Sequence, residues 1–204
     1  MTRTITLVTI SILSVVFTML GASSLADAAI YMKFEGIPGD VTVRGYEGYI
    51  ELDSFSFGTN NEIKKFGVRG TEDINIGIGE LSEVIITKSL DSSSAKLAQF
   101  AINGNSPGQA DIHFVEVAGS EGQPVAYLQY KLDRVFIKSW STSGDADDRP
   151  TEEISFYYNR IAFQYSPGGI SDPDKMMSWD LKKKAPWDAI FQAILGVFYP
   201  TQLQ

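Results

Sequence analysis

The sequence contains no cysteine and a single histidine, His113, among its 204 residues. The lack of cysteine excludes disulfides, thiolate metal sites, cysteine nucleophiles and a lipid anchor on an N-terminal cysteine. Basic residues are also few, with 17 Lys and Arg against 25 Asp and Glu, so the formal net charge is −8. Such a surface repels a phosphate backbone, and nucleic acid is therefore not an expected partner.

A long uncharged apolar run occurs at the start of the chain. Residues 5–20 carry no charge, follow the basic Arg3 and precede Ala26-Asp27-Ala28. This order is typical of a secretory signal peptide. We predict that residues 1–28 are a signal peptide cleaved after Ala28, and that the folded part is exported, secreted or periplasmic. The alternative is a retained membrane anchor. A membrane-spanning helix needs about 20 apolar residues, but the run 5–20 is shorter and is interrupted by Thr and Ser.

The rest of the chain has the composition of a folded domain, because 44% of the residues are apolar and 12% are aromatic. Residues 30–58 predict two strands around a Gly/Pro turn. Tyr31 and Lys33 point to one side, whereas Met32 and Phe34 point to the other. Side chains of a strand alternate with a period of two, so this pattern indicates a sheet.

Further strands are expected at 83–90, 111–118, 125–139 and 153–165. Within the last one, alternation places Ile154, Phe156, Tyr158 and Ala162 on one face, and Tyr157, Ile161, Phe163 and Tyr165 on the other. One helix is expected at 95–102, with capping residues at 91–94 and a C-cap at Asn103-Gly104. Leu97 pairs with Ala101 and Ala98 with Ile102 at a spacing of four, which predicts an apolar stripe toward the sheet.

Two segments lie outside this pattern. Residues 59–80 are rich in glycine and asparagine, and they predict a long loop with short strands that serves as an interaction surface or as a simple surface excursion. After the basic run 182–184, Pro186 begins a predicted amphipathic helix that ends near Phe198. This helix packs on the sheet, contacts another subunit or docks on an anionic membrane surface.

Candidate catalytic residues are few. His113 lies in mid-strand, and no serine has the surroundings of a nucleophile elbow, so a Ser-His-acid triad is not expected. Glu51 and Asp53 share a strand face, but no facing acidic strand is identifiable, and acid-base chemistry by this pair is unsupported. We predict a protein that is not an enzyme and has no cofactor.

Candidate ligand sites are also weak. The segment with Asp145, Asp147 and Asp148 lacks the glycine and the distant glutamate of a calcium loop, so it is interpreted as an acidic hairpin tip. Gly77 and Gly79 are not followed by a βαβ unit or a lysine, which argues against a phosphate-binding loop. No metal site is predicted.

Taken together, six segments in register give the chain a family resemblance. Their order resembles that of the Hcp family, the haemolysin-coregulated tube protein of bacterial type VI secretion, over roughly residues 30–181. The segments are YMKFEGIPGDV, IELDSFSFG, EVIITKSLDSSSAKLAQFAINGN, YLQYKLDRVFIKSWSTSG, EEISFYYNRIAFQYSP and SWDL.

The resemblance implies a mainly β protein with a closed β-barrel and one helix packed beside it. The resemblance covers an Hcp-like domain (29–181), and the sequence pattern adds a signal peptide before it (1–28) and a basic run with a C-terminal amphipathic helix after it (182–204). The resemblance also implies a hexameric ring that stacks into tubes, carries effectors and contacts type VI secretion components. The 59–80 loop is then expected to mediate ring stacking. The alternative hypothesis is a monomeric exported binding module that engages a ligand, a partner or a membrane surface.

Overall fold

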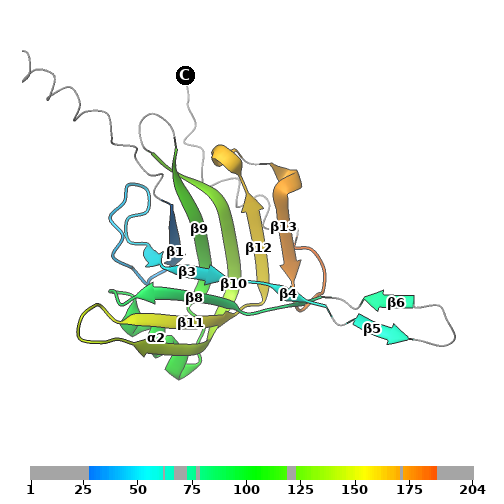
Figure 1. The fold of residues 1–204 in the computed structure, drawn as a ribbon, viewed down its shortest axis with the longest axis horizontal. Coiled ribbons are helices and arrows are strands. Elements are labelled where there is room, and N and C mark those ends of the chain that lie inside the picture. The colour runs from blue at the N-terminus through cyan, green and yellow to red at the C-terminus, as the bar shows by residue number, and fades with distance from the viewer. Residues whose placement is uncertain are drawn as a thin grey trace, which may run out of the picture.

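The computed structural model describes residues 28–61, 63–66, 73–76, 79–118, 123–170 and 172–187. The regular structure in these residues is mostly β-strand, with one α-helix and two short 3-10 turns, which confirms the mainly β prediction (Figure 1). Most of the predicted signal peptide and of the predicted C-terminal helix lies outside the described residues. The elements are β1 (Ala29–Phe34), β2 (Ile50–Leu52), β3 (Ser54–Ser56), β4 (Thr59–Asn60), β5 (Ile63–Phe66), β6 (Asp73–Ile76), β7 (Glu80–Leu81), β8 (Val84–Ser89), α2 (Ser94–Asn103), β9 (Gly108–Ala118), β10 (Gln123–Ser143), β11 (Thr151–Tyr157), β12 (Arg160–Tyr165) and β13 (Met176–Asp180), with short 3-10 turns at Pro167–Gly169 and Pro173–Lys175.

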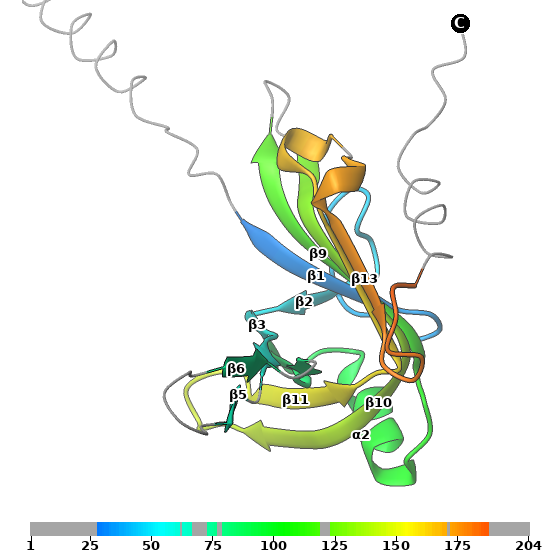
Figure 2. The same cartoon turned by 90° about the vertical axis from the view of Figure 1, so that its right-hand side faces the viewer.

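The main sheet has nine strands and is organised around β10. Its path runs β2-β1-β9-β10-β11-β8-β3, and β12 joins β10 and carries β13 at its outer edge. The 21 residues of β10 pair with β9 and β12 over their first half and with β11 over their second half. Figure 2 shows β10 curving from the upper layer, with β1 and β9, into the lower layer, with β11. One long bent strand therefore joins the two layers.

The two ends of the sheet path, β2 and β3, are consecutive in the chain. Only Asp53 separates them, and its amide donates to the carbonyl of Thr87 at 2.8 Å. Within the described residues β2 and β3 are linked by the chain and not by a strand pairing. The sheet therefore wraps around a core, whereas full closure as a barrel stays a prediction.

The core lies between the two layers. Cross-strand neighbours share a face, so Met32 on β1 lies opposite both Ile50 on β2 and Ile112 on β9, and all three are fully buried. The lower layer contributes Ile86 and Ile154, which are paired and equally buried. Complete burial of each such side chain stabilises the folded state by roughly 1.5–3 kcal/mol.

The prediction of one strand over 153–165 was wrong, because the chain turns a corner at Tyr158 and Asn159. Strand β11 ends before this corner and β12 begins after it. The cause lies in β10, where the pairing register shifts and Arg134 has φ 51°, so its two halves bind different strands. The alternation of inward and outward side chains does not continue through this corner and starts again in β12. Ile161 therefore faces the core as Phe156 does, although the sequence pattern placed them on opposite faces.

Helix α2 begins at Ser94 and ends at Asn103, close to the predicted 95–102. The predicted C-cap is confirmed, because Gly104 has φ 69° and its amide donates to the carbonyl of Phe100. Leu97 is fully buried in the core, but Ile102 is 86% exposed. The apolar stripe is thus narrower than the spacing predicted, and Ile102 faces solvent.

Candidate assembly surfaces and a buried polar cluster

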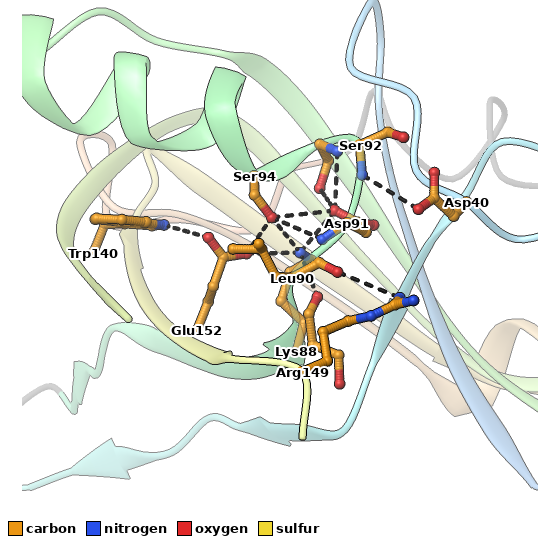
Figure 3. A network of polar contacts seen from close by, with 11 residues as sticks. Asp40, Lys88, Leu90, Asp91, Ser92, Ser94, Trp140, Arg149 and Glu152 are labelled. Carbon is orange, nitrogen blue, oxygen red and sulfur yellow. Dashed lines mark hydrogen bonds and ion pairs between the residues drawn. The ribbon is translucent and has the colours of Figure 1, made fainter. Parts of the chain in front are cut away.

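A buried polar cluster joins the start of helix α2 to the inner face of the lower layer (Figure 3). Lys88 on β8 and Glu152 on β11 are cross-strand neighbours, both fully buried, with Lys88 Nζ 2.7 Å from Glu152 Oε2. Lys88 Nζ is also 2.7 Å from Asp91 Oδ1, and it donates to Ser94 Oγ at 3.0 Å. Ser94 Oγ donates to Glu152 Oε2 at 2.6 Å, and Trp140 Nε1 donates to Glu152 Oε1 at 2.9 Å.

This cluster fixes where the helix begins. Ser94 is its first residue, and Asp91 Oδ1 accepts a hydrogen bond from the amide of Ser93 at 2.9 Å. The predicted capping segment 91–94 therefore acts through Asp91 and Ser94, because the N-cap Ser93 makes no side-chain cap hydrogen bond. Removing one partner of a buried ion pair leaves the other charge uncompensated, which is strongly destabilising. The sequence pattern did not predict this cluster.

His113 lies on β9, as predicted, and it is 6% exposed. The rings of Tyr46 and Tyr49, from the loop between β1 and β2, lie 5.8 and 5.9 Å from its ring. Tyr31 on β1 is its cross-strand neighbour and packs against Tyr46 at 4.9 Å between ring centroids. His113 thus belongs to a second small cluster, on the face of the upper layer opposite the main core.

The electrostatics of this second cluster favour neutral side chains. Burial lowers the pKa of His113 to about 4, against an ordinary value of 6.5; nearby Asp111 opposes the shift, and Lys131 and Lys33 add to it. Burial also raises the pKa of Tyr46 to about 12. Both rings are therefore uncharged at neutral pH.

The acidic residues that were considered as a calcium loop form an exposed hairpin tip. The amide of Asp147 donates to Asp145 Oδ1 at 3.0 Å, and Asp148 Oδ1 accepts from the amide of Arg149 at 2.7 Å. Across the described part of the chain, no group of three or more His, Cys, Asp or Glu side chains has the geometry of a metal site.

The described residues give no support for a phosphate-binding loop at the two glycines that were considered for it. Gly77 lies outside the described residues. A Cβ on Gly79 would lie 2.3 Å from Asn61 Oδ1, but this atom ends an exposed side chain that can move away, so the contact alone does not require glycine at this position.

Glu51 and Asp53 border a pocket of about 240 Å³ between the β1–β2 loop and the start of helix α2. The structure brings Asp40 and Asp91 to them, which the sequence did not predict, and Asp40 Oδ2 accepts a long hydrogen bond from the amide of Ser92 at 3.4 Å. The pocket is small and mostly acidic, with one arginine. Its lining residues are Asp40, Val41, Glu51, Asp53, Ser89, Asp91 and Arg149.

The predicted loop 59–80 contains short strands, as expected. Strand β4 pairs with β7 at its base, and β5 pairs with β6 farther out. Figure 1 shows the β5–β6 hairpin extending away from the body of the protein. Such a projection, held at its base by two paired strands, can reach a neighbouring molecule.

Large apolar side chains are exposed elsewhere on the surface. Phe136 on β10 and Tyr157 on β11 are cross-strand neighbours that are 36% and 53% exposed. Lys138 Nζ lies 5.3 Å from the centre of the Tyr157 ring and 2.8 Å from Glu83 Oε2. Exposed apolar groups at adjacent positions are typical of contact surfaces between proteins. Other exposed large apolar residues are Val43, Leu90, Ile102, Tyr165 and Ile170.

The last described residues run along β12 and β13. Ser178 Oγ donates to the carbonyl of Trp187 at 3.1 Å and accepts from its amide at 3.0 Å, and the Arg160 guanidinium lies 4.9 Å from the centre of the Trp187 ring. The predicted helix 186–198 lies outside the described residues beyond Trp187. Among the helices that the structure describes, none is long and apolar enough to cross a membrane.

Comparison with known proteins gives a consistent result. The model of the family "Type VI secretion system effector, Hcp" matches residues 31–165. A solved type six secretion system protein has 26% identity and a TM-score of 0.68, with 79% of this chain and 100% of that chain covered. No curated protein matches the sequence.

More distant structures share the fold. Hcp1 from Salmonella typhimurium has 18% identity and a TM-score of 0.64, with 80% of this chain and 100% of that chain covered. Hcp1 from E. coli EAEC 042 has 22% identity and a TM-score of 0.61, with 76% of this chain and 99% of that chain covered. Because the family model spans most of the described domain, this chain belongs to the Hcp family of type VI secretion system effectors.

Proposed function

We propose that this protein is a non-enzymatic subunit that assembles with copies of itself into a hexameric ring, and that such rings stack into tubes. The observation that carries the proposal is the family match over 31–165, together with a structural match that covers the whole of a type six secretion system protein. The fold is thus present in full, and the additional residues of this chain extend beyond it.

Two surfaces support assembly. Phe136 and Tyr157 expose adjacent aromatic side chains on the lower layer, and a contact between neighbouring subunits of a hexameric ring would bury such groups. The β5–β6 hairpin projects from the body and suits a contact between stacked rings. Other type VI secretion components, or effectors carried inside the ring, are the partners that this role implies.

The experiment is a molar-mass measurement on the purified protein over a wide concentration range, by light scattering after size separation. We expect a species of six subunits. Replacing Phe136 and Tyr157 by serine is expected to shift the equilibrium toward the monomer. The control Ile102→Ser removes an 86% exposed apolar side chain from helix α2 and is expected to leave the molar mass unchanged. A monomer at every concentration would favour the binding-module hypothesis instead.

Export by a cleaved signal peptide is a separate part of the proposal. The sequence order Arg3, apolar run 5–20 and Ala26-Asp27-Ala28 supports it. The N-terminal residue of the protein recovered from each cell compartment tests it directly. Mature protein beginning at Ala29 outside the cytoplasm is expected, whereas protein that begins at Met1 in the cytoplasm contradicts the export proposal and leaves ring assembly untouched.

The predicted C-terminal helix is proposed as a further contact surface. Its predicted first residues, Pro186 and Trp187, are the last that the structure describes, and Ser178 and Arg160 hold Trp187 against β12 and β13. Deletion of residues 188–204 distinguishes a role of this helix in contacts with partners from a role in the core of the fold. A truncated protein that stays folded but loses assembly or vesicle binding identifies the helix as a contact surface, whereas a protein that unfolds identifies it as part of the core.

A further inference from the structure

The buried cluster around Lys88 holds the reactants of an amide-forming reaction. A primary amine and two carboxylates meet in a site where Lys88 and Glu152 are fully buried and Asp91 is 10% exposed. The amine nitrogen lies 2.7 Å from an oxygen of each carboxylate. In water a lysine and a glutamate form only a transient ion pair, but here the strand pairing of β8 with β11 keeps them in contact.

We propose that Lys88 and Glu152 become joined by an amide bond between Lys88 Nζ and Glu152 Cδ. The bond is an intramolecular isopeptide crosslink that forms once in each folded molecule. It goes beyond the proposed ring assembly and does not depend on it. The chain has no cysteine, so this crosslink is a covalent link between strands that disulfides cannot provide in this protein.

The atoms balance without an oxidant or a cofactor. The reactants are an ammonium group and a carboxylate. Lys88 Nζ gives one proton to Asp91 Oδ1 and attacks Glu152 Cδ with the freed electron pair. The N–C bond forms, the C–Oε2 bond breaks, and Oε2 leaves as water after it takes a proton from Asp91 and a second proton from the attacking nitrogen. Asp91 ends as the carboxylate it was at the start.

The neighbouring groups are placed for this chemistry. Trp140 Nε1 donates to Glu152 Oε1 at 2.9 Å, so it stabilises the negative charge that develops on that oxygen during attack. Ser94 Oγ contacts both Lys88 Nζ and Glu152 Oε2, and so it can relay a proton to the leaving oxygen (Figure 3). Asp91 Oδ1 contacts the amine directly. Nucleophile, acyl group, oxyanion donor and proton carrier are therefore all present.

The buried environment also favours the product. The reactant cluster holds three formal charges, one ammonium and two carboxylates, whereas the product holds only the carboxylate of Asp91. Charges removed from water are costly even when they are paired. Replacing an ion pair by a neutral amide removes two of them, and the released water leaves through the partly exposed side at Asp91.

The test is mass spectrometry of the purified folded protein. We expect its intact mass to be lower than the mass of its determined sequence by one water molecule. Trypsin cannot cut at a modified Lys88, and the bond between Arg149 and Pro150 resists cleavage. The digest should therefore contain residues 70–96 joined to residues 139–160.

Matched variants separate this reaction from other losses of water. Lys88→Arg keeps the positive charge but has no amine nucleophile, and we expect it to show the full mass. Lys138→Arg makes the same change in an exposed ion pair, at 2.8 Å from Glu83, and we expect it to retain the crosslink. Asp91→Asn and Trp140→Phe are expected to lower the fraction of crosslinked molecules at a fixed time after folding.

The wild-type measurement decides the proposal even if a variant fails to fold. A wild-type protein with the full calculated mass, whose digest releases residues 70–88 with an unmodified Lys88, would overturn it. A crosslink that maps to Asp91 in place of Glu152 would also overturn the assignment.

Discussion

The burial of His113 makes the stability of the fold depend on pH in a predictable way. Its pKa is about 4 in the folded protein, and an exposed histidine in the unfolded chain has a pKa of 6.5. The unfolded chain therefore binds more protons between these values, and acid favours unfolding. The contribution of neutral His113 is fully present above pH 6.5 and is lost as the pH falls toward 4. The loss is about 2 kcal/mol at pH 5 and about 3 kcal/mol at pH 4.

The assay is denaturant unfolding at pH 7, 5 and 4, and the control is His113→Gln. Other groups also titrate in acid, so the informative quantity is the difference between the two proteins at each pH. Glutamine does not titrate, and the wild type should therefore lose about 2 kcal/mol more than the variant between pH 7 and pH 5. If the two proteins lose stability in parallel over this range, His113 is not held neutral by its burial against Tyr46 and Tyr49, and the reasoning fails.

Three further predictions concern packing and assembly. Leu97→Ala empties a fully buried site and should lower the free energy of unfolding by roughly 2–5 kcal/mol in denaturant titrations, whereas the exposed Ile102→Ala should change it by less than about 0.5 kcal/mol. Gly39→Ala places a Cβ 2.3 Å from the carbonyl oxygen of Tyr49 and should cost about 1–3 kcal/mol, while Gly58→Ala meets only Ser82 Oγ at 3.8 Å and should be close to neutral by the same assay. Replacing Phe136 and Tyr157 by serine should lower the assembled fraction in light scattering, because both side chains are partly exposed on the monomer and available to a neighbouring subunit. Equal stability losses for Leu97→Ala and Ile102→Ala, or for the two glycine variants, would contradict the packing described for these positions.

The sequence carries much of the fold because strand patterns are local. Alternation at Tyr31 to Phe34 predicts β1, and Gly104 after an apolar helical stretch predicts the end of α2. The corner at Tyr158 and Asn159 has no such signal, because it depends on where the distant strand β10 bends. If the two faces are assigned by simple alternation through 153–165, every residue after the corner is therefore assigned to the wrong face.

The buried cluster could have been found from the same alternation. Lys88 follows Val84 and Ile86 at a spacing of two, so it shares their buried face, and Glu152 precedes Ile154 and Phe156 in the same way. A charged residue on the buried, apolar face of a strand needs a partner of opposite charge. Which two strands are neighbours, and hence that Lys88 meets Glu152, follows only from the tertiary structure.

The assembly claim is tested most directly by electron microscopy of the purified protein at high concentration. We expect particles whose averages show a ring with six equal subunits, and we expect some of these rings to be stacked. Particles of single-subunit size at every concentration, from protein shown to be folded, would contradict it.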